Sequence, residues 1–396
     1  MRVFNILDYG AVPGSPDLQT KAIQQAFDAC RENGGTVVIP CGSFRTGGLR
    51  MWSDTTLRLD PGAHLIASET CEDYPVFDVP EDVELHTDME LITQYYQNRP
   101  WPEYRRALLS VYGGENISVI GAADSVIDGQ DCCDPNGEEG YRGPHGFFFT
   151  NVKNVRLEGY TIRRCGNFMH QIDTCENVTL RSVTCIGGSD GVHLHHCRHI
   201  RIEDCIFHTG DDCIAGINME DMTVRNCEIN TSCQAFRCGG SHILIENCRI
   251  WGPGIYPHRM TIIPARGTEA VRNRKYDLPQ TSGRHNLICV YLHFASTNFI
   301  ASQPYHDVVF RNCSIENADS FLLYHANEGT LMSGTHLTEL KLENVSMTGL
   351  KEPSSVWADP VEPLTITLQN VRYSFREGVK DSSLIGSDAV HTTVLS

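Results

Sequence analysis

The chain has 396 residues, 41% of them hydrophobic, so it is long enough to bury a large core. Its formal net charge of −17 disfavours nucleic acids and anionic membranes as partners. The sequence also has no apolar run of the roughly 18 residues that span a bilayer. From the charge and the missing apolar run together, we expect neither a nucleic-acid nor a membrane partner.

The spacing of the cysteines and the N-terminal residues give an expectation for the cellular compartment. The first ten residues lack the pattern of a signal peptide, and the 17 cysteines include no CxxC pair. This pattern indicates reduced, structural thiols and a cytoplasmic location. Secretion is the alternative if a signal peptide has been removed.

In chain order, residues 18–32 predict an amphipathic helix that ends near Gly34, and we expect an N-terminal cap helix within residues 15–34. Short β-rich runs follow at residues 36–39, 56–59, 63–66 and 117–120, separated by Gly, Asn and Asp. One helix before a long array of strands is typical of a cap over the end of a solenoid core.

A repeat becomes visible from residue 154. Successive units share a nine-residue pattern of alternating apolar and polar residues and are spaced 23, 22, 22 and 21 residues apart. They begin at Asn154, Asn177, His199, Asp221 and His242, and similar units recur near Asp307 and Leu340. The leucine-rich repeat frame and its helix are missing, so the period favours a parallel β-helix with three short strands per turn.

This repeat places particular side chains inside the coil. Val155, Leu157 and Gly159 alternate toward the interior of one strand. Cys205, Cys227 and Cys248 occupy equivalent positions in successive units, so we expect them to stack about 4.8 Å apart as core residues. The sequence therefore predicts an all-β chain, one parallel β-helix domain over residues 1–396.

Two stretches interrupt the repeat, residues 72–106 and residues 253–304. The first is acidic and aromatic, and the second is rich in Tyr, Pro and Arg. Insertions in a solenoid form loops on the faces of the coil, frequently on the binding face. We interpret both as long loops that either border a binding surface or simply cover the core.

Three carboxylates form the candidate chemical centre. Asp190 lies in Gly188-Ser189-Asp190-Gly191, while Asp211 and Asp212 lie in Thr209-Gly210-Asp211-Asp212-Cys213. Asp190 and Asp212 are 22 residues apart, one repeat, so they should lie on neighbouring coils. Adjacent residues such as Asp211 and Asp212 share one side only at a bend, which Gly210 permits. Acidic turn residues or a calcium site are the alternatives.

Paired carboxylates of this kind suit glycoside hydrolysis. The reaction needs one carboxylic acid to protonate the leaving oxygen and one carboxylate to activate water or attack the sugar. Crowded carboxylates also separate their pKa values, which keeps one of them protonated near neutral pH.

The sequence resembles glycoside hydrolase family 28, the polygalacturonases and their relatives. The resemblance covers most of the chain and includes Asp8-Tyr9-Gly10-Ala11, Ile127-Asp128-Gly129-Gln130, and the complete Gly-Asp-Asp motif at residues 210–212. The family's Asn-Thr-Asp motif keeps only its last residue, Asp190. The resemblance implies an inverting mechanism in which Asp211 is the general acid and Asp190 and Asp212 activate water. Inversion also implies carboxyl groups about 6.5–9.5 Å apart.

Two family motifs differ in this chain. The His-Gly motif falls one coil after Asp212, where the sequence has Gln234, and glutamine cannot carry a proton near neutral pH. The Arg-x-Lys motif is closest to Arg259-Met260-Thr261, which lacks the lysine. Both differences argue against ordinary endo-polygalacturonan hydrolysis.

The remaining candidates are histidines and an arginine. His193 and His195 follow Asp190 on one strand face, and repeat spacing places Arg237 two coils beyond His193. We predict that His170, His193, Gln234, Arg237 and Arg259 contact substrate, with His170 beginning the same column. A zinc site at these histidines is conceivable, but it lacks a third ligand at recognisable spacing.

We therefore expect an inverting glycoside hydrolase that acts from the chain end on oligosaccharides of pectin-like or other plant or bacterial polysaccharides, without cofactor or metal. A uronate lyase or epimerase with His193 as its base is one alternative. A carbohydrate-binding β-helix without catalysis is the other. The sequence leaves the sugar, the linkage, endo or exo action and the oligomeric state open.

Overall fold

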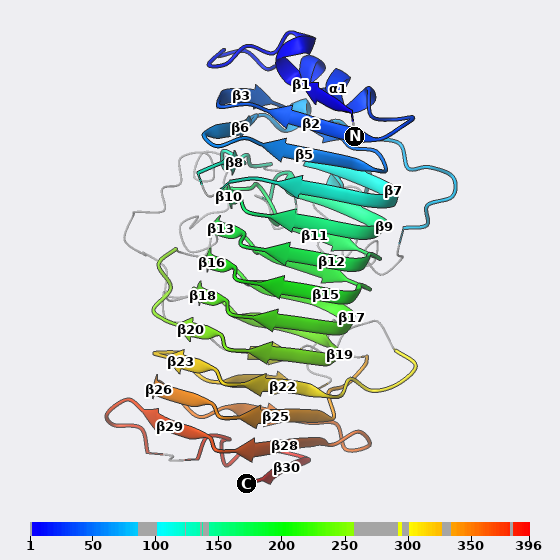
Figure 1. Cartoon of the computed structure of the whole chain (residues 1–396). Helices are drawn as coiled ribbons and strands as arrows, with labels where there is room; N and C mark the ends of the chain where they lie inside the picture. Colours follow the sequence, from blue (N-terminus) through cyan, green and yellow to red (C-terminus); the bar gives the residue numbers. More distant parts are fainter. Residues whose placement is uncertain are drawn as a thin grey trace.

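The computed structural model describes residues 2–85, 101–122, 124–134, 137, 142–256, 292–294, 301–326, 334–380 and 383–396. In these ranges the chain winds into a stack of coils that runs from the N-terminal helix to the C-terminus (Figure 1). Every pairing between named strands is parallel and joins one coil to the next, so the architecture is the predicted parallel β-helix.

The larger sheet contains 19 strands, and most coils add two strands to it because the chain turns a corner inside the sheet. Its members are β1 (Val3–Asn5), β2 (Gly35–Ile39), β4 (Leu49–Arg50), β5 (Thr55–Leu59), β7 (Ala107–Ile120), β9 (His145–Glu158), β11 (His170–Asp173), β12 (Glu176–Arg181), β14 (Val192–His195), β15 (Arg198–Glu203), β17 (Ile214–Arg225), β19 (Phe236–Glu246), β21 (Leu292–Phe294), β22 (Val308–Arg311), β24 (Leu322–His325), β25 (Glu339–Glu343), β27 (Ser355–Trp357), β28 (Leu364–Gln369) and β30 (Thr392–Leu395).

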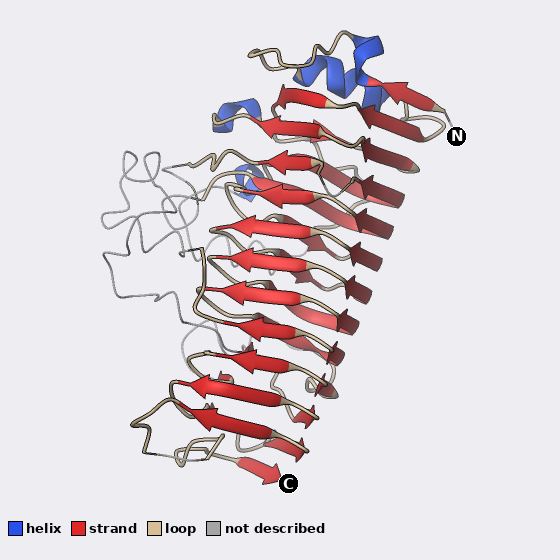
Figure 2. Ribbon diagram, turned by 60° about the vertical axis from the view of Figure 1, so that its left-hand side comes forward, coloured by secondary structure: helices blue, strands red, loops and turns tan. Residues whose placement is uncertain are grey.

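The second sheet contains 11 strands and faces the first across the core (Figure 2). Its members are β3 (Gly42–Thr46), β6 (Ala63–Ala67), β8 (Val126–Asp128), β10 (Thr161–Arg163), β13 (Thr184–Gly187), β16 (Ile206–Thr209), β18 (Glu228–Thr231), β20 (Arg249–Trp251), β23 (Ser314–Glu316), β26 (Ser346–Leu350) and β29 (Arg372–Phe375).

The N-terminal end of the core is covered by α1 (Thr20–Asp28), preceded by the 3-10 helix η1 (Ile6–Tyr9). Ile23, Ala26 and Phe27 form the buried face of α1. The helix is shorter than the predicted 15–34, because the chain leaves it in turns that end at Gly34 in the left-handed region (φ 64°). Two further short helices are η2 (Cys71–Asp73) and α3 (Trp101–Tyr104). No helix in the described ranges has the length and apolar character of a membrane span.

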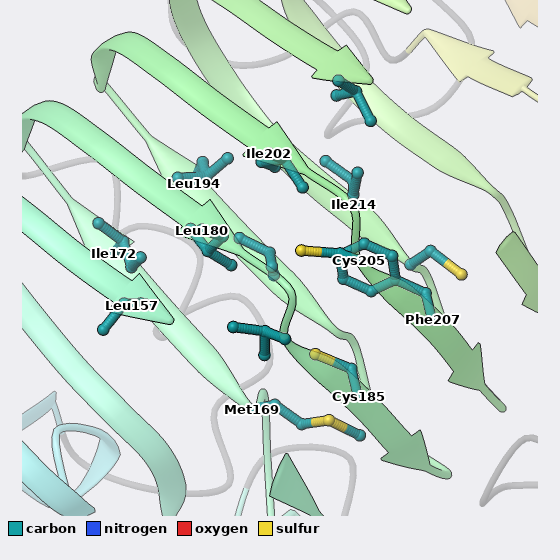
Figure 3. Packing of buried hydrophobic residues seen from close by; sticks show 14 of the residues in the cluster. Leu157, Met169, Ile172, Leu180, Cys185, Leu194, Ile202, Cys205, Phe207 and Ile214 are labelled. Atoms are coloured by element: carbon teal, nitrogen blue, oxygen red, sulfur yellow. The ribbon is translucent and has the colours of Figure 1, made fainter. Parts of the chain in front are cut away.

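The core is built from columns of equivalent residues. Strand register aligns Leu157, Leu180, Ile202, Val224 and Ile245 on successive coils, and all are at most 1% exposed. Figure 3 shows Leu157, Leu180 and Ile202 pointing into the same interior as the labelled residues of the opposite sheet. The alternating pattern of the repeat therefore specifies one continuous core.

The corners of the coil depend on left-handed residues. The first residue of each repeat unit has a positive φ: 61° at Asn154, 57° at Asn177, 56° at His199, 55° at Asp221 and 57° at His242. Asn, Asp and His accept this conformation more readily than other non-glycine residues do. Side chains in this column also bond from coil to coil, as from Asn177 Nδ2 to Asn154 Oδ1 at 3.0 Å. The start of each unit is therefore a corner.

The second sheet borders a column of cysteines. Cys205, Cys227, Cys248 and Cys313 directly precede paired strands, are buried and are unoxidised. Each thiol donates to the backbone oxygen two residues earlier, for example Cys227 Sγ to Arg225 O at 3.3 Å. The predicted stack of core thiols is present. Gly159, by contrast, is not an inward position: it lies at a corner with φ 78°.

Candidate active site

The three predicted carboxylates lie on two stacked bends between the sheets. Asp190 lies between β13 and β14, and Asp211 and Asp212 lie between β16 and β17. The bends are hydrogen-bonded one above the other, since Gly191 N donates to Asp212 O and Cys213 N donates to Gln234 O, both at 3.0 Å. Asp190, Asp212 and Gln234 are thus successive members of one column, as the 22-residue spacing predicts.

The bend at Asp211 is fixed from inside the coil. The hydroxyls of Thr209 and Thr231, both fully buried, each donate to Asp211 O at 2.6 Å. This arrangement interrupts the strand, so consecutive acids lie on one side. Carboxylate oxygens of Asp211 and Asp212 and Cys233 Sγ lie within 4.8 Å of one another. The expectation that Asp211 and Asp212 share one side at a bend is met.

Burial and mutual repulsion control the protonation of this cluster. Asp190, Asp211 and Asp212 are 2%, 6% and 3% exposed. Burial, followed by the charge of Asp211, raises the pKa of Asp212 to about 7. Burial, followed by the charges of Asp211 and Asp212, raises the pKa of Asp190 well above its usual value. The cluster therefore retains at least one proton near neutral pH.

Arg142 provides a buried counter-charge to the cluster. Its Nη2 donates to Asp211 Oδ2 at 2.9 Å, and its Nη1 donates to Asn167 Oδ1 at 3.2 Å. The Arg142 and Asp211 side chains are only 8% and 9% exposed. The guanidinium also lies over the Phe168 ring, 5.3 Å from its centroid. Since Asp211 Oδ1 accepts from Asp212 N at 3.1 Å, both oxygens of Asp211 are oriented by the protein.

A second row of side chains lies beside the carboxylates on the outer face of the larger sheet. Strand register aligns Phe148, Gln171, His193, Ala215 and Arg237 on successive coils, which confirms the predicted alignment of His193 with Arg237. His193 Nδ1 lies 2.9 Å from Asp190 Oδ2. Burial, followed by the neighbouring His195, holds the pKa of His193 well below its usual value, so its ring is neutral near neutral pH.

His170 does not belong to this row. Register pairs Gln171, and not His170, with His193. His170 is fully buried, with Nε2 3.0 Å from Tyr160 Oη and Nδ1 2.8 Å from Gly191 O. The prediction that His170 begins the column of His193 is wrong, because His170 is one residue away from Gln171 and adjacent residues of a strand point to opposite faces of the sheet. His170 instead holds the backbone directly after Asp190.

Of the two residues at the altered family motifs, the structure describes Gln234 and not Arg259. Gln234 occupies the position of the missing His-Gly motif, and its backbone N donates to Asp212 Oδ1 at 3.2 Å. Arg259 lies outside the described residues, as do parts of both predicted loop stretches.

Sequence reasoning missed Arg142, Asn167 and Phe168. Phe168 and Asn167 precede Asp190 and Asp211 by one or two repeat lengths, and the Phe168 ring stacks on His193 with centroids 4.2 Å apart. Repeat phase alone would have found these two residues. Arg142 lies in a connection that has no repeat phase, so no signal in the sequence marked it.

A family model described as Glycosyl hydrolases family 28 matches residues 94–244. Among curated proteins, an exo-poly-alpha-D-galacturonosidase of Dickeya chrysanthemi is 26% identical over 261 residues. The match spans 54% of this chain and only 41% of that relative.

Solved structures share the fold over nearly the whole chain. A family 28 exopolygalacturonase of Yersinia enterocolitica has a TM-score of 0.67 at 18% identity, covering 99% of this chain and 78% of its own. An exopolygalacturonase of Thermotoga maritima has a TM-score of 0.69 at 15% identity, covering 96% and 88%. The chain thus matches the glycosyl hydrolase family 28 model over residues 94–244, is similar to an exo-acting polygalacturonase relative over about half its length, and shares the right-handed parallel β-helix of two exopolygalacturonases.

Proposed function

We propose that this chain is an inverting glycoside hydrolase that removes sugars from the end of acidic, pectin-like oligosaccharides. The observation that carries this proposal is the buried cluster of Asp190, Asp211 and Asp212 on two adjacent coils, with Arg142 as its counter-charge. The names of the exo-acting relatives from Dickeya and Yersinia support the choice of substrate and of exo action.

The roles follow the family resemblance. Asp211 protonates the leaving oxygen as the glycosidic bond breaks, while Asp190 and Asp212 orient a water and accept its proton. In the resting site both oxygens of Asp211 accept hydrogen bonds, so the proton is stored on Asp190 or Asp212. Before the glycosidic bond breaks, this proton passes to Asp211, which leaves its neighbours ionised to accept the proton of the water. The raised pKa values of Asp212 and Asp190 provide that store.

The test compares purified wild-type protein with Asp211→Asn on galacturonic acid oligosaccharides of two to six sugars. Proton NMR of the first turnovers reads the anomer of the product, and product sizes distinguish release of terminal sugars from internal cleavage. We expect inversion, terminal release and loss of turnover in Asp211→Asn with an unchanged circular dichroism spectrum.

The matched control is Asp204→Asn, at an exposed corner where the next coils carry Asn226 and Asn247. Full activity in Asp211→Asn, or a retained anomer, would overturn the assignment. An unsaturated product that absorbs in the near ultraviolet would instead favour the lyase, with neutral His193 as the base.

A further inference from the structure

A buried arginine without a counter-charge lies beyond the carboxylate cluster. Arg105 comes just before β7 and is 8% exposed, and its Nε and Nη1 make no hydrogen bond. No carboxylate of the described residues forms an ion pair with it. Burying an unpaired charge is costly, so a cation in this state marks a place where an anion is missing.

Two buried hydroxyls lie beside Arg105. They belong to Ser110 and Tyr112, which are 1% and 5% exposed. The Arg105 guanidinium lies 5.6 Å from the Tyr112 ring centroid. Burial raises the pKa of Tyr112, and the charge of Arg105 opposes that rise, which places the two groups in electrostatic contact. A planar guanidinium with adjacent hydroxyls suits a carboxylate, which accepts several hydrogen bonds at once.

This group faces the same side of the larger sheet as the catalytic residues. Register aligns Ser110, Phe148, Gln171 and His193 on four successive strands. Three interstrand steps of about 4.8 Å separate Ser110 from His193, or roughly 14 Å. Between them, Gln171 is fully buried, and neither its Nε2 nor its Oε1 makes a hydrogen bond. Polar atoms with unused hydrogen-bonding capacity thus lie on Arg105 and on Gln171, with the Phe148 ring between the two positions.

We propose that Arg105, Ser110 and Tyr112 bind the carboxylate of a uronic sugar in the same oligosaccharide that the catalytic cluster cleaves, and that Gln171 binds a sugar hydroxyl between them. The bound carboxylate supplies the negative charge that Arg105 lacks. This inference rests on the proposed function, and it deepens it: the enzyme recognises an acidic sugar several positions from the cleaved bond.

The distance between the Arg105 group and the catalytic carboxylates determines whether a substitution changes KM or kcat. A group about 14 Å from the reacting carboxylates contacts no reacting atom, so it affects binding and leaves the chemical step alone. For acidic oligosaccharides long enough to reach Arg105, we expect Arg105→Gln to raise KM about 10- to 100-fold at unchanged kcat, the range for lost hydrogen bonds to a charged group. Disaccharides end before Arg105, so their KM should be the same in both proteins.

The experiment measures kcat and KM of wild type, Arg105→Gln and Arg105→Lys on galacturonic acid oligosaccharides of two to six sugars and on their methyl esters. Arg105→Lys, which keeps the charge, should recover part of the affinity. Methyl esterification, which removes the sugar charge, should abolish the difference between wild type and Arg105→Gln. The control is Arg156→Gln, an exposed arginine on the same sheet paired with Glu158, which should behave as wild type.

The unfolding temperature of Arg105→Gln distinguishes a binding role of Arg105 from a structural one. Because Arg105 is buried without a partner, Arg105→Gln should unfold at the same temperature as wild type or a higher one. A lower unfolding temperature, equal losses on disaccharides and on methyl esters, or an unchanged KM would each overturn the inference. Titration calorimetry of the Asp211→Asn protein reads binding without turnover. If wild type cleaves no oligosaccharide, the proposed function fails, whereas turnover that is indifferent to Arg105 defeats only this inference.

Discussion

Replacing Asp212 by asparagine should change how stability depends on pH. In the folded protein the pKa of Asp212 is raised from 3.8 to about 7, mainly by burial. The folded state therefore holds this proton more tightly than the unfolded chain does, and stability falls as pH rises from about 4 to 7. At 1.36 kcal/mol per pH unit, the raised pKa corresponds to a loss of about 4 kcal/mol above pH 7.

Asp212→Asn removes the titrating group and keeps the shape of the side chain, so this loss should disappear. For a chain of 396 residues, about 4 kcal/mol corresponds to roughly 5 °C in unfolding temperature. Differential scanning calorimetry at pH 5 and pH 8 should show wild type losing about that much relative to Asp212→Asn. Asp204→Asn, at its exposed corner, should retain the wild-type pH dependence. Equal pH dependence in wild type and Asp212→Asn would refute the reasoning.

Two further substitutions probe the counter-charge and the core. Arg142→Gln leaves Asp211 buried without its cation and should cost about 3–5 kcal/mol in chemical unfolding, with much of the loss recovered in the Arg142→Gln/Asp211→Asn double variant. Guanidinium chloride at low concentration should partly restore its turnover; activity equal to wild type without added guanidinium would show that Arg142 is dispensable. Ile202→Ala should cost about 2–5 kcal/mol because Ile202 is fully buried in its column, and a loss below 1 kcal/mol would mean that the coil collapses around the cavity.

The fold was largely predictable because the same sequence pattern recurs on successive coils. The apolar alternation that points Leu157 and Leu180 inward recurs on each coil, so an error in one unit is corrected by the next. Gly159 and the ends of α1 were misjudged for a local reason. Gly159 lies at a corner with a left-handed φ, which the apolar alternation does not reveal. The ends of α1, at Thr20 and Asp28, lie inside a stretch whose apolar pattern continues, and Ala29 after the helix still has a right-handed φ of −66°.

The site was predictable where it follows the repeat and unpredictable where it does not. Asp190, Asp212 and Gln234 obey the 22-residue spacing, and so do His193 and Arg237. His170 was placed in the wrong column because its spacing to His193 is 23, one residue from register. Arg142 reaches the cluster from an irregular connection, and its contact with Asp211 spans 69 residues of sequence, which no local pattern encodes.

Because the corners are regular, the number of turns sets the distance between two groups on the solenoid. From Asn154 to His242 the coils meet through the same left-handed positions, so a complete turn in this part of the chain can be added or removed without altering the turns on either side. The number of turns between Arg105 and Asp190 then sets the length of oligosaccharide that touches both. Removing the turn that contains β11 and β12 would bring the two groups one interstrand step closer and shift the preferred substrate toward shorter chains.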